Sequence, residues 1–288
     1  MQIIRRMRGE SCPYLVKASD NRFYVAQLGG LLGDRAFINE WLGYCLFRRF
    51  NVSTPALHLL HFSDDVSTTA RNPHSEIPGQ IAVIWPGIYC GSQYPVDPTI
   101  TAVYDFLPRK FLSNVVNLTD FAKAYVLDQL LGNTSVRQAV FARDRLTGGK
   151  GQFRAYFVGH GQILGGTAWE ITKSSPCGLY WDQYVYSLID MPALCEQYLR
   201  LVSTITEGEL LAVVEEIPSQ WFAKGEYTAL MNLLRLVYER ITNLSDLIPQ
   251  RLEEFGLASN INLGPTQKRT IKRWNTPYLN TSLQHVTC

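Results

Sequence analysis

The chain has 288 residues, of which 46% are hydrophobic, 18% charged and 12% aromatic, and its formal net charge is +2. This length suffices for one large domain or for two lobes that share a cleft, and the hydrophobic share is ordinary for a chain that buries a core. A charge so near zero argues against a dedicated nucleic-acid-binding protein, whose domain is usually strongly basic. Two small basic clusters are therefore interpreted as solvated ends of the chain: Arg5, Arg6 and Arg8, and Lys268, Arg269, Lys272 and Arg273.

The cysteines and the apolar segments favour a cytoplasmic protein. Six cysteines are scattered without a C-x-x-C pair, so we expect reduced thiols and no zinc site. The basic segment 1–9 is not followed by the apolar stretch of a secretory signal. The longest apolar runs, such as 80–87, are far shorter than the roughly 20 residues of a membrane helix. Neither a membrane nor a nucleic acid is expected as a partner.

The first third of the chain predicts a small mixed sheet with one helix. Residues 14–17 and 22–28 are short β-rich runs on either side of a Ser-Asp-Asn turn signal. Apolar residues fall at helical spacing from residue 35, with Asp34 available as a cap and Pro55 beyond the end. The glycines at 29, 30 and 33 lack G-x-G-x-x-G spacing, which makes them weak evidence for a phosphate-binding loop.

Two further apolar runs, 56–62 and 80–85, flank a polar loop at 63–78, and a loop-rich crossover is predicted near 87–108. The remainder is predicted to be mostly helical with one β-hairpin. The predicted helices are 118–131, which stops at Gly132-Asn133, then 191–202, 207–216 and 226–244, and the predicted hairpin strands are 138–143 and 152–158.

This order of elements predicts an α+β fold, with an N-terminal part at 1–97, a helical part at 98–255 and a polar tail at 256–288. It is also the outline of a two-lobed kinase-like fold. Six segments in a fixed order strengthen that interpretation: Tyr24-Val25-Ala26-Gln27; Asn39-Glu40 with the turn Val52-Ser53-Thr54-Pro55; 87–95; Phe121 to Asp128 with Asn133-Thr134; 157–161; and 217–222. Together they resemble the HipA-like kinase family, especially its single-chain bacterial-type members.

The resemblance implies a two-lobed protein-kinase-like fold, with a sheet-plus-helix N-lobe and a mostly helical C-lobe that contains the hairpin. Such kinases use a lysine to position the nucleotide phosphates, an aspartate to orient the attacking hydroxyl, and an asparagine and a second aspartate to hold magnesium. The matching positions here carry Gln27, Ser135, Val140 and Gly159. Valine and glycine offer no side-chain oxygen to magnesium, which prefers oxygen ligands.

The resemblance therefore implies a pseudokinase that binds a protein partner or a small ligand. The alternative is a divergent ATP-dependent serine/threonine kinase with non-standard catalytic residues, and ATP and magnesium are expected as cofactors only in that case. A third hypothesis is a structural subunit whose segment 256–288 docks elsewhere.

One rival catalytic pair has the spacing of a kinase catalytic loop. Asp128 and Asn133 are five residues apart, as in the D-x-x-x-x-N arrangement of base and metal ligand. Asp128 falls inside a strong helical pattern, however, whereas the kinase pair lies on a loop. We therefore favour a capping or hydrogen-bonding role for Asp128.

The other candidate residues are those that would line a remnant nucleotide pocket. Glu40 would pair with a lysine in an active relative, and with Gln27 in that place it either binds Arg137 or faces solvent. Arg137 and Gln138 follow the substituted catalytic position and are candidates to line the pocket. For His160 we favour a hydrogen bond within the hairpin over a catalytic role.

Overall fold

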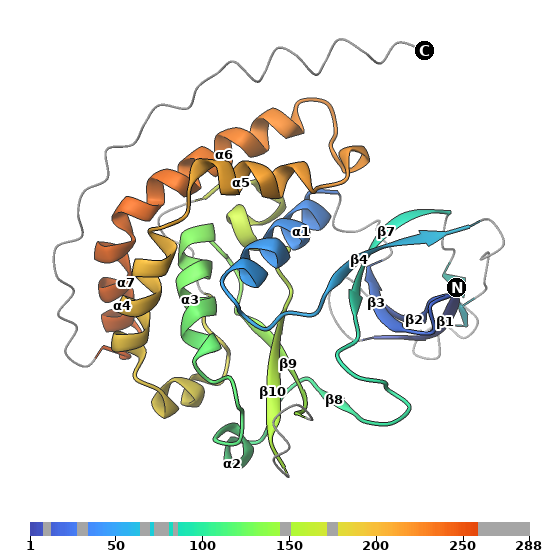
Figure 1. The fold of residues 1–288 in the computed structure, drawn as a ribbon, viewed down its shortest axis with the longest axis horizontal. Helices are drawn as coiled ribbons and strands as arrows, with labels where there is room; N and C mark the ends of the chain where they lie inside the picture. Colours follow the sequence, from blue (N-terminus) through green and yellow to red (C-terminus); the bar gives the residue numbers. More distant parts are fainter. Residues whose placement is uncertain are drawn as a thin grey trace.

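The computed structural model describes residues 1–7, 13–27, 34–63, 70–71, 81–82, 86–144, 151–171 and 178–258. It is an α+β protein in which a five-stranded sheet lies to one side of a larger body of helices (Figure 1). Several sequence predictions lie outside the described residues: the glycines at 29, 30 and 33, most of the loop 63–78, three of the cysteines, the basic cluster at 268–273 and the tail beyond 258.

The five-stranded sheet has the order β1-β2-β3-β7-β4, and every neighbouring pair is antiparallel. The expectation of a mixed sheet was therefore wrong. A helical crossover joins β3 to β4, which would allow them to pair in parallel, but β7 lies between them and pairs with both. The strands are β1 (Gln2–Arg6), β2 (Tyr14–Lys17), β3 (Phe23–Gln27), β4 (Leu57–Phe62) and β7 (Gly87–Gln93).

The predicted strands β2, β3 and β4 are confirmed, but the other two strands of this sheet, β1 and β7, were missed. The segment that begins at Gly87 was expected to be loop-rich, and it is the strand β7 beside β3 and β4. This strand was not predicted because glycines are usually turn signals. A Cβ added at Gly91 would lie 2.3 Å from a methyl carbon of Leu60 on β4, so close packing between the strands requires glycine there. Arg5 and Arg6 were interpreted as part of a solvated end, and both lie in the edge strand β1.

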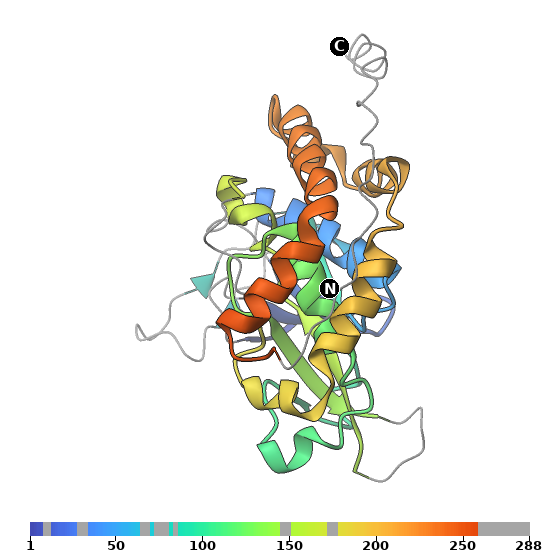
Figure 2. The ribbon, with the colours of Figure 1, turned by 90° about the vertical axis from the view of Figure 1, so that its left-hand side faces the viewer.

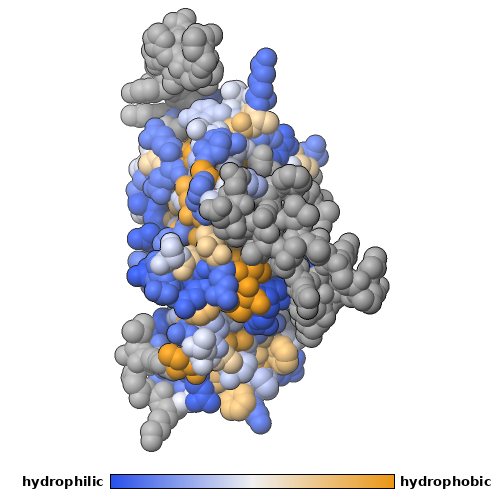
Figure 3. Space-filling view, turned by 90° about the vertical axis from the view of Figure 1, so that its right-hand side faces the viewer, coloured by the Kyte–Doolittle hydropathy of each residue, from blue (hydrophilic) through white to orange (hydrophobic). Residues whose placement is uncertain are grey.

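The helix α1 (Asp34–Arg49) confirms the predicted first helix. Its side chains Phe37, Ile38, Leu42, Leu46 and Phe47 belong to the large hydrophobic core that it shares with the C-terminal helices. A second, smaller core within the sheet is formed by Tyr14, Val16, Tyr24, Ala26, Leu60 and Phe62. Although α1 precedes β4 in the chain, it is packed with the helical part of the molecule. On the side of the molecule that bears the sheet, hydrophobic residues lie in separate groups among hydrophilic ones (Figure 3).

The central helix α3 (Asp120–Leu131) is confirmed, with eleven of its residues buried. It ends where predicted, because Gly132 adopts a left-handed conformation with φ of 62°. The predicted hairpin is also confirmed as β9 (Gln138–Arg143) paired with β10 (Phe153–Val158), and the short strand β8 (Val103–Tyr104) pairs with the other edge of β9.

The outer edge of β10 is covered by the chain that leads into α3. The side-chain amide of Asn117 donates to the carbonyl of Ala155 and its oxygen accepts from the backbone N–H of the same residue, both at 2.9 Å. Asn117 therefore satisfies an edge that would otherwise offer free backbone groups. A short helix, α2 (Arg109–Leu112), lies upstream of this contact.

The C-terminal helices largely follow the predicted pattern, with one missed helix. The observed α4 (Met191–Val202), α5 (Glu207–Glu215) and α6 (Glu226–Arg240) confirm the three predicted helices, although α6 ends earlier than expected. The 3-10 turn η5 (Ile241–Asn243) follows it and leads into the unpredicted α7 (Leu244–Glu254), which contains Pro249. Figure 2 shows α6 and α7 one after the other along the same side of the molecule. Three further 3-10 segments are η2 (Ile163–Ala168), η3 (Gln183–Leu188) and η4 (Ser219–Trp221).

Among the described residues, none of the helices combines the length and the apolar character that a membrane crossing requires.

Candidate functional site

The candidate residues meet where α1, α3 and the β9–β10 hairpin come together. Glu40 lies on α1 and is 8% exposed, so of the two alternatives the one in which it faces solvent is wrong. Its Oε1 accepts a hydrogen bond of 2.8 Å from the backbone N–H of Gly161. Burial raises the pKa of Glu40, while the backbone N–H groups of His160 and Gly161, the charge of Arg137 and a hydrogen bond with the Gln27 side chain oppose that rise.

Gln27 ends β3 directly opposite Cys90 on β7, which brings its side chain to Glu40. Gln27 thus contacts Glu40 without carrying a charge. The contact preserves a polar link between the sheet and α1. It supplies no cation to position phosphate groups.

Asp128 and Arg137 form a buried ion pair. Asp128 is 0% exposed and Arg137 is 1% exposed. The guanidinium donates through Nε to Oδ2 of Asp128 at 2.7 Å and through Nη2 to Oδ1, which is a two-pronged contact. Burial raises the pKa of the Asp128 carboxyl, and the opposite charge of Arg137 works against that rise.

Asn133 completes the environment of this carboxylate. Its side-chain amide donates to Oδ1 of Asp128 at 3.0 Å, and its own oxygen accepts from the backbone N–H of Ser135 at 3.0 Å. Both oxygens of Asp128 are therefore occupied by protein donors. The pair with kinase-like spacing ties the end of α3 to the following loop, in agreement with the hydrogen-bonding role favoured from the sequence.

Arg137 also joins the hairpin to α1. Its Nη1 donates to the carbonyls of Val158 and Gly159, at 3.0 and 3.2 Å. The guanidinium lies 5.0 Å from the centre of the Phe47 ring, a cation–π contact with α1. A single buried cation thus contacts α1, α3 and β10. A buried charge with this many partners is strongly held, because removing any one partner leaves it uncompensated.

His160 is buried beside Arg137 and is 2% exposed. Its Nδ1 lies 3.4 Å from Nη1 of Arg137, and its ring packs edge-on against Phe47 with 4.4 Å between ring centres. Burial lowers the pKa of His160 well below 6.5, and the charge of Arg137 lowers it further. A Cβ added at Gly43 on α1 would lie 2.4 Å from Cβ of His160, so the ring occupies space that only glycine provides. Burial and the charge of Arg137 thus favour the neutral imidazole, which contacts Arg137 and packs against Phe47 and Gly43.

The remaining family-equivalent positions lie at the surface of the same junction. Ser135 and Val140 are partly buried, and Gln138 is exposed. Gly159 has φ of 73°, and a Cβ added there would lie 3.1 Å from Oε1 of Gln138. The structure thus brings Gln138 against Gly159, while Val140 is on β9 opposite Tyr156 on β10.

Asn39 is the polar residue whose role the sequence did not reveal. Its side-chain amide donates to the carbonyls of Gly161, Ile163 and Gly166 at 2.9 to 3.2 Å. Its oxygen accepts from the indole N–H of Trp169 at 2.9 Å. One side chain therefore holds the whole segment after β10 to α1. The sequence signal for this role was the position of Asn39, a polar residue in the middle of an apolar helical pattern.

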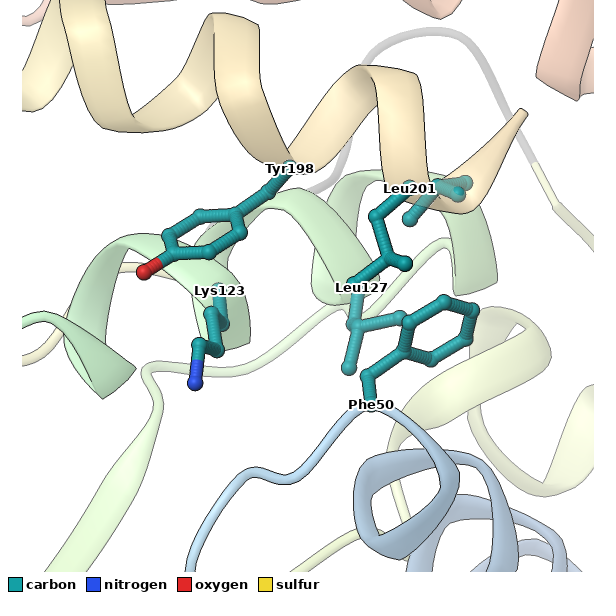
Figure 4. Close-up of a pocket in the computed structure, with 6 residues that line it drawn as sticks. Phe50, Lys123, Leu127, Tyr198 and Leu201 are labelled. Carbon is teal, nitrogen blue, oxygen red and sulfur yellow. The ribbon is translucent and has the colours of Figure 1, made fainter. Parts of the chain in front are cut away.

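A small hollow lies away from these residues, between the end of α1, α3 and α4 (Figure 4). Its volume is about 10 Å³, enough for roughly one water molecule. Lys123 at its rim is bound to Asp120 and to the carbonyl of Asn51, at 3.0 and 3.2 Å. The hollow is too small to hold a ligand.

The geometry defines what this junction can do chemically. Asp128 is 0% exposed, and its two oxygens accept three hydrogen bonds from Arg137 and Asn133, so the carboxylate is not open to magnesium or to a substrate. Glu40 is held by Gly161 and Gln27. Within the described parts of the chain, no group of three or more His, Cys, Asp or Glu side chains is placed to hold a metal ion. The described arrangement is that of a rigid polar link between three elements.

No family model matches this chain, and no curated protein matches it either.

Proposed function

We propose that the chain is a non-catalytic, HipA-like member of the kinase-like proteins, which acts by binding a partner protein or a small ligand. The five-stranded sheet corresponds to the smaller lobe and the helices with the hairpin to the larger lobe. The contact between Gln27 and Glu40 supports this correspondence, because a lysine–glutamate pair occupies that place in active kinases.

The observation that carries the proposal is the burial of Asp128 against Arg137. Asp128, the carboxylate of the rival pair with kinase-like spacing, is fully buried, and its two oxygens accept hydrogen bonds from Arg137 and Asn133. The charge of Arg137 neutralises it within the fold. The other family-equivalent positions carry glutamine, serine, valine and glycine. Losing preorganised charge stabilisation commonly costs several kcal/mol of barrier for each group.

The proposal predicts that magnesium adds nothing to nucleotide binding. The melting temperature of the protein would be measured with ATP, once with Mg²⁺ and once with EDTA, since a ligand that binds only the folded state raises it. We expect equal melting temperatures, because positions 140 and 159 supply no side-chain oxygen to a metal ion. A shift of several degrees that requires both ATP and Mg²⁺ would favour the divergent serine/threonine kinase instead.

A further inference from the structure

A group of exposed aromatic side chains belongs to β8, α2 and η3 or to residues next to them; β8 and α2 lie in the lower part of the view in Figure 1. These residues, which we call the aromatic surface, are Tyr104, Phe106, Phe111, Trp181 and Tyr184, with exposures of 37% to 58%. Large exposed aromatic side chains of this kind are typical anchors of protein interfaces. The proposed function, on which this inference rests, leaves open where a partner binds.

Contacts between the three elements make this a single surface. The rings of Tyr104 and Phe111 both pack against Phe153, with 6.0 Å between ring centres. Arg109 on α2 forms an ion pair with Asp182 at 2.9 Å and lies 5.3 Å from the centre of the Tyr184 ring. The exposed rings are thus held in place by neighbours instead of moving freely. Pre-ordered side chains lose less entropy when a partner binds.

The charges of the aromatic surface favour an acidic partner. Asp182 is already paired with Arg109, whose side chain is still 68% exposed. Lys110 lies over the ring of Phe111, 5.0 Å from its centre. Arg143 is exposed on β9, directly opposite Phe153. Among the described residues 103–112, 138–143 and 181–188, the cations Arg109, Lys110 and Arg143 stand against two acids, Asp182 and the exposed Asp105. Carboxylates that approach the rings would therefore meet a net positive charge.

Backbone hydrogen bonds join the segment just before Trp181 to residues 135 and 137. The backbone N–H of Gly178 donates to the carbonyl of Ser135 at 3.1 Å, and the backbone N–H of Arg137 donates to the carbonyl of Leu179 at 2.9 Å. Trp181 follows two residues later and is 57% exposed. We propose that the aromatic surface docks an acidic linear segment of a partner protein, with apolar side chains against the rings and carboxylates against Lys110 and Arg143.

A phage-displayed random peptide library selected on the full chain tests this proposal. We expect acidic peptides with aromatic or aliphatic residues to be enriched, and their binding to weaken as salt is added. Fluorescently labelled copies of the selected peptides would then be titrated against variants. Trp181→Ala is expected to weaken binding by about 10-fold or more, as for an interface anchor, and Lys110→Glu is expected to weaken it as well.

The matched controls are Tyr227→Ala and Lys224→Glu, which alter exposed residues at the start of α6. All four variants should melt within about 2 °C of the parent chain, because exposed substitutions rarely affect stability. The controls should bind the peptides unchanged. The proposal is overturned if no acidic peptides are enriched, or if the selected peptides bind the Trp181→Ala variant equally well.

Other occupants would also overturn it. One such outcome is displacement of the peptides by a single-stranded oligonucleotide or by anionic lipid vesicles. Another is that the chain forms a dimer and that the Trp181→Ala substitution dissociates it. The test is independent of catalysis. If the protein transfers phosphate and the peptides still bind here, the proposed function fails and the docking surface stands. If the protein does not transfer phosphate and no peptides bind here, only the docking surface fails.

Discussion

Arg137 is a buried arginine with a structural role. In a buried pair, each charge has lost its hydration, and the partner replaces it only while the geometry holds. Here the geometry includes a two-pronged contact with Asp128, two carbonyls of the hairpin and the Phe47 ring. The side chain has no donor directed to solvent. It is a fixed internal cation.

This leads to a prediction for unfolding by urea. Arg137→Met leaves Asp128 buried without its partner and is expected to lower the free energy of unfolding by about 3–5 kcal/mol. Combining it with Asp128→Leu should recover much of that loss, because the unpaired charge is removed. The control is Arg200→Met, which breaks the exposed pair with Glu196 and should cost less than about 1 kcal/mol. Equal losses for the two single arginine variants would contradict the buried role of Arg137.

His160 predicts a dependence of stability on pH. Its pKa in the folded state lies well below 6.5, so the unfolded chain binds the proton more readily. The stabilising contribution is therefore complete above pH of about 6.5 and is lost as the pH falls towards the folded-state pKa. The loss is at most about 1.4 kcal/mol for each pH unit.

The measurement compares the parent chain with His160→Asn by urea unfolding between neutral and mildly acidic pH. Glu40 and Asp128, whose pKa values are raised, shift stability in the opposite direction, but both are present in each protein. The stability difference between parent and variant should therefore shrink as the pH falls. A difference that is constant over this range would show that the His160 pKa is not depressed.

At the scale of elements, α1 is attached to the segment after β10 mainly through Asn39. Asn39→Ala removes the acceptor of the Trp169 indole and the donor to three carbonyls. We expect a loss of about 2–4 kcal/mol, since each buried group left unpaired costs about 1–3 kcal/mol.

Hydrogen exchange provides the corresponding local measurement, and the amides of 161–169 should exchange faster in Asn39→Ala than in the parent. The matched control is Asn232→Ala, which alters an exposed asparagine on α6. Faster exchange throughout the protein, with no excess at 161–169, would mean that Asn39 acts on global stability alone.

The elements differ in how far the sequence could predict them. Strong periodicity and clear end signals predicted α3, α4 and the hairpin, because local preference and packing agree there. β7 was missed because Gly87 and Gly91 are turn signals locally, whereas Leu60 on a distant strand requires a glycine at 91. α7 was missed because Pro249 interrupts the helical pattern. In the candidate site, a hydrogen-bonding role for Asp128 followed from its helix, but its partner depends on how the hairpin folds over α3.

At the scale of the whole molecule, the sheet, α1 and the hairpin meet through polar contacts. In this chain the same region holds a neutral Gln27, a buried Glu40 and the Asp128–Arg137 pair. The buried polar side chains of this junction bind one another and the backbone, and these contacts stabilise the fold. The aromatic surface, which we propose as the docking site, lies outside this junction and is exposed.

The most direct test of this account is phosphate transfer from labelled ATP in the presence of Mg²⁺. The chain and its Asp128→Asn variant would be incubated with a mixture of serine- and threonine-containing peptides, and incorporation into the peptides and into the chain itself would be counted. Circular dichroism would first establish that the variant is folded. The account predicts no incorporation by the parent above a protein-free blank. Incorporation by the parent that disappears in the folded Asp128→Asn variant would contradict it.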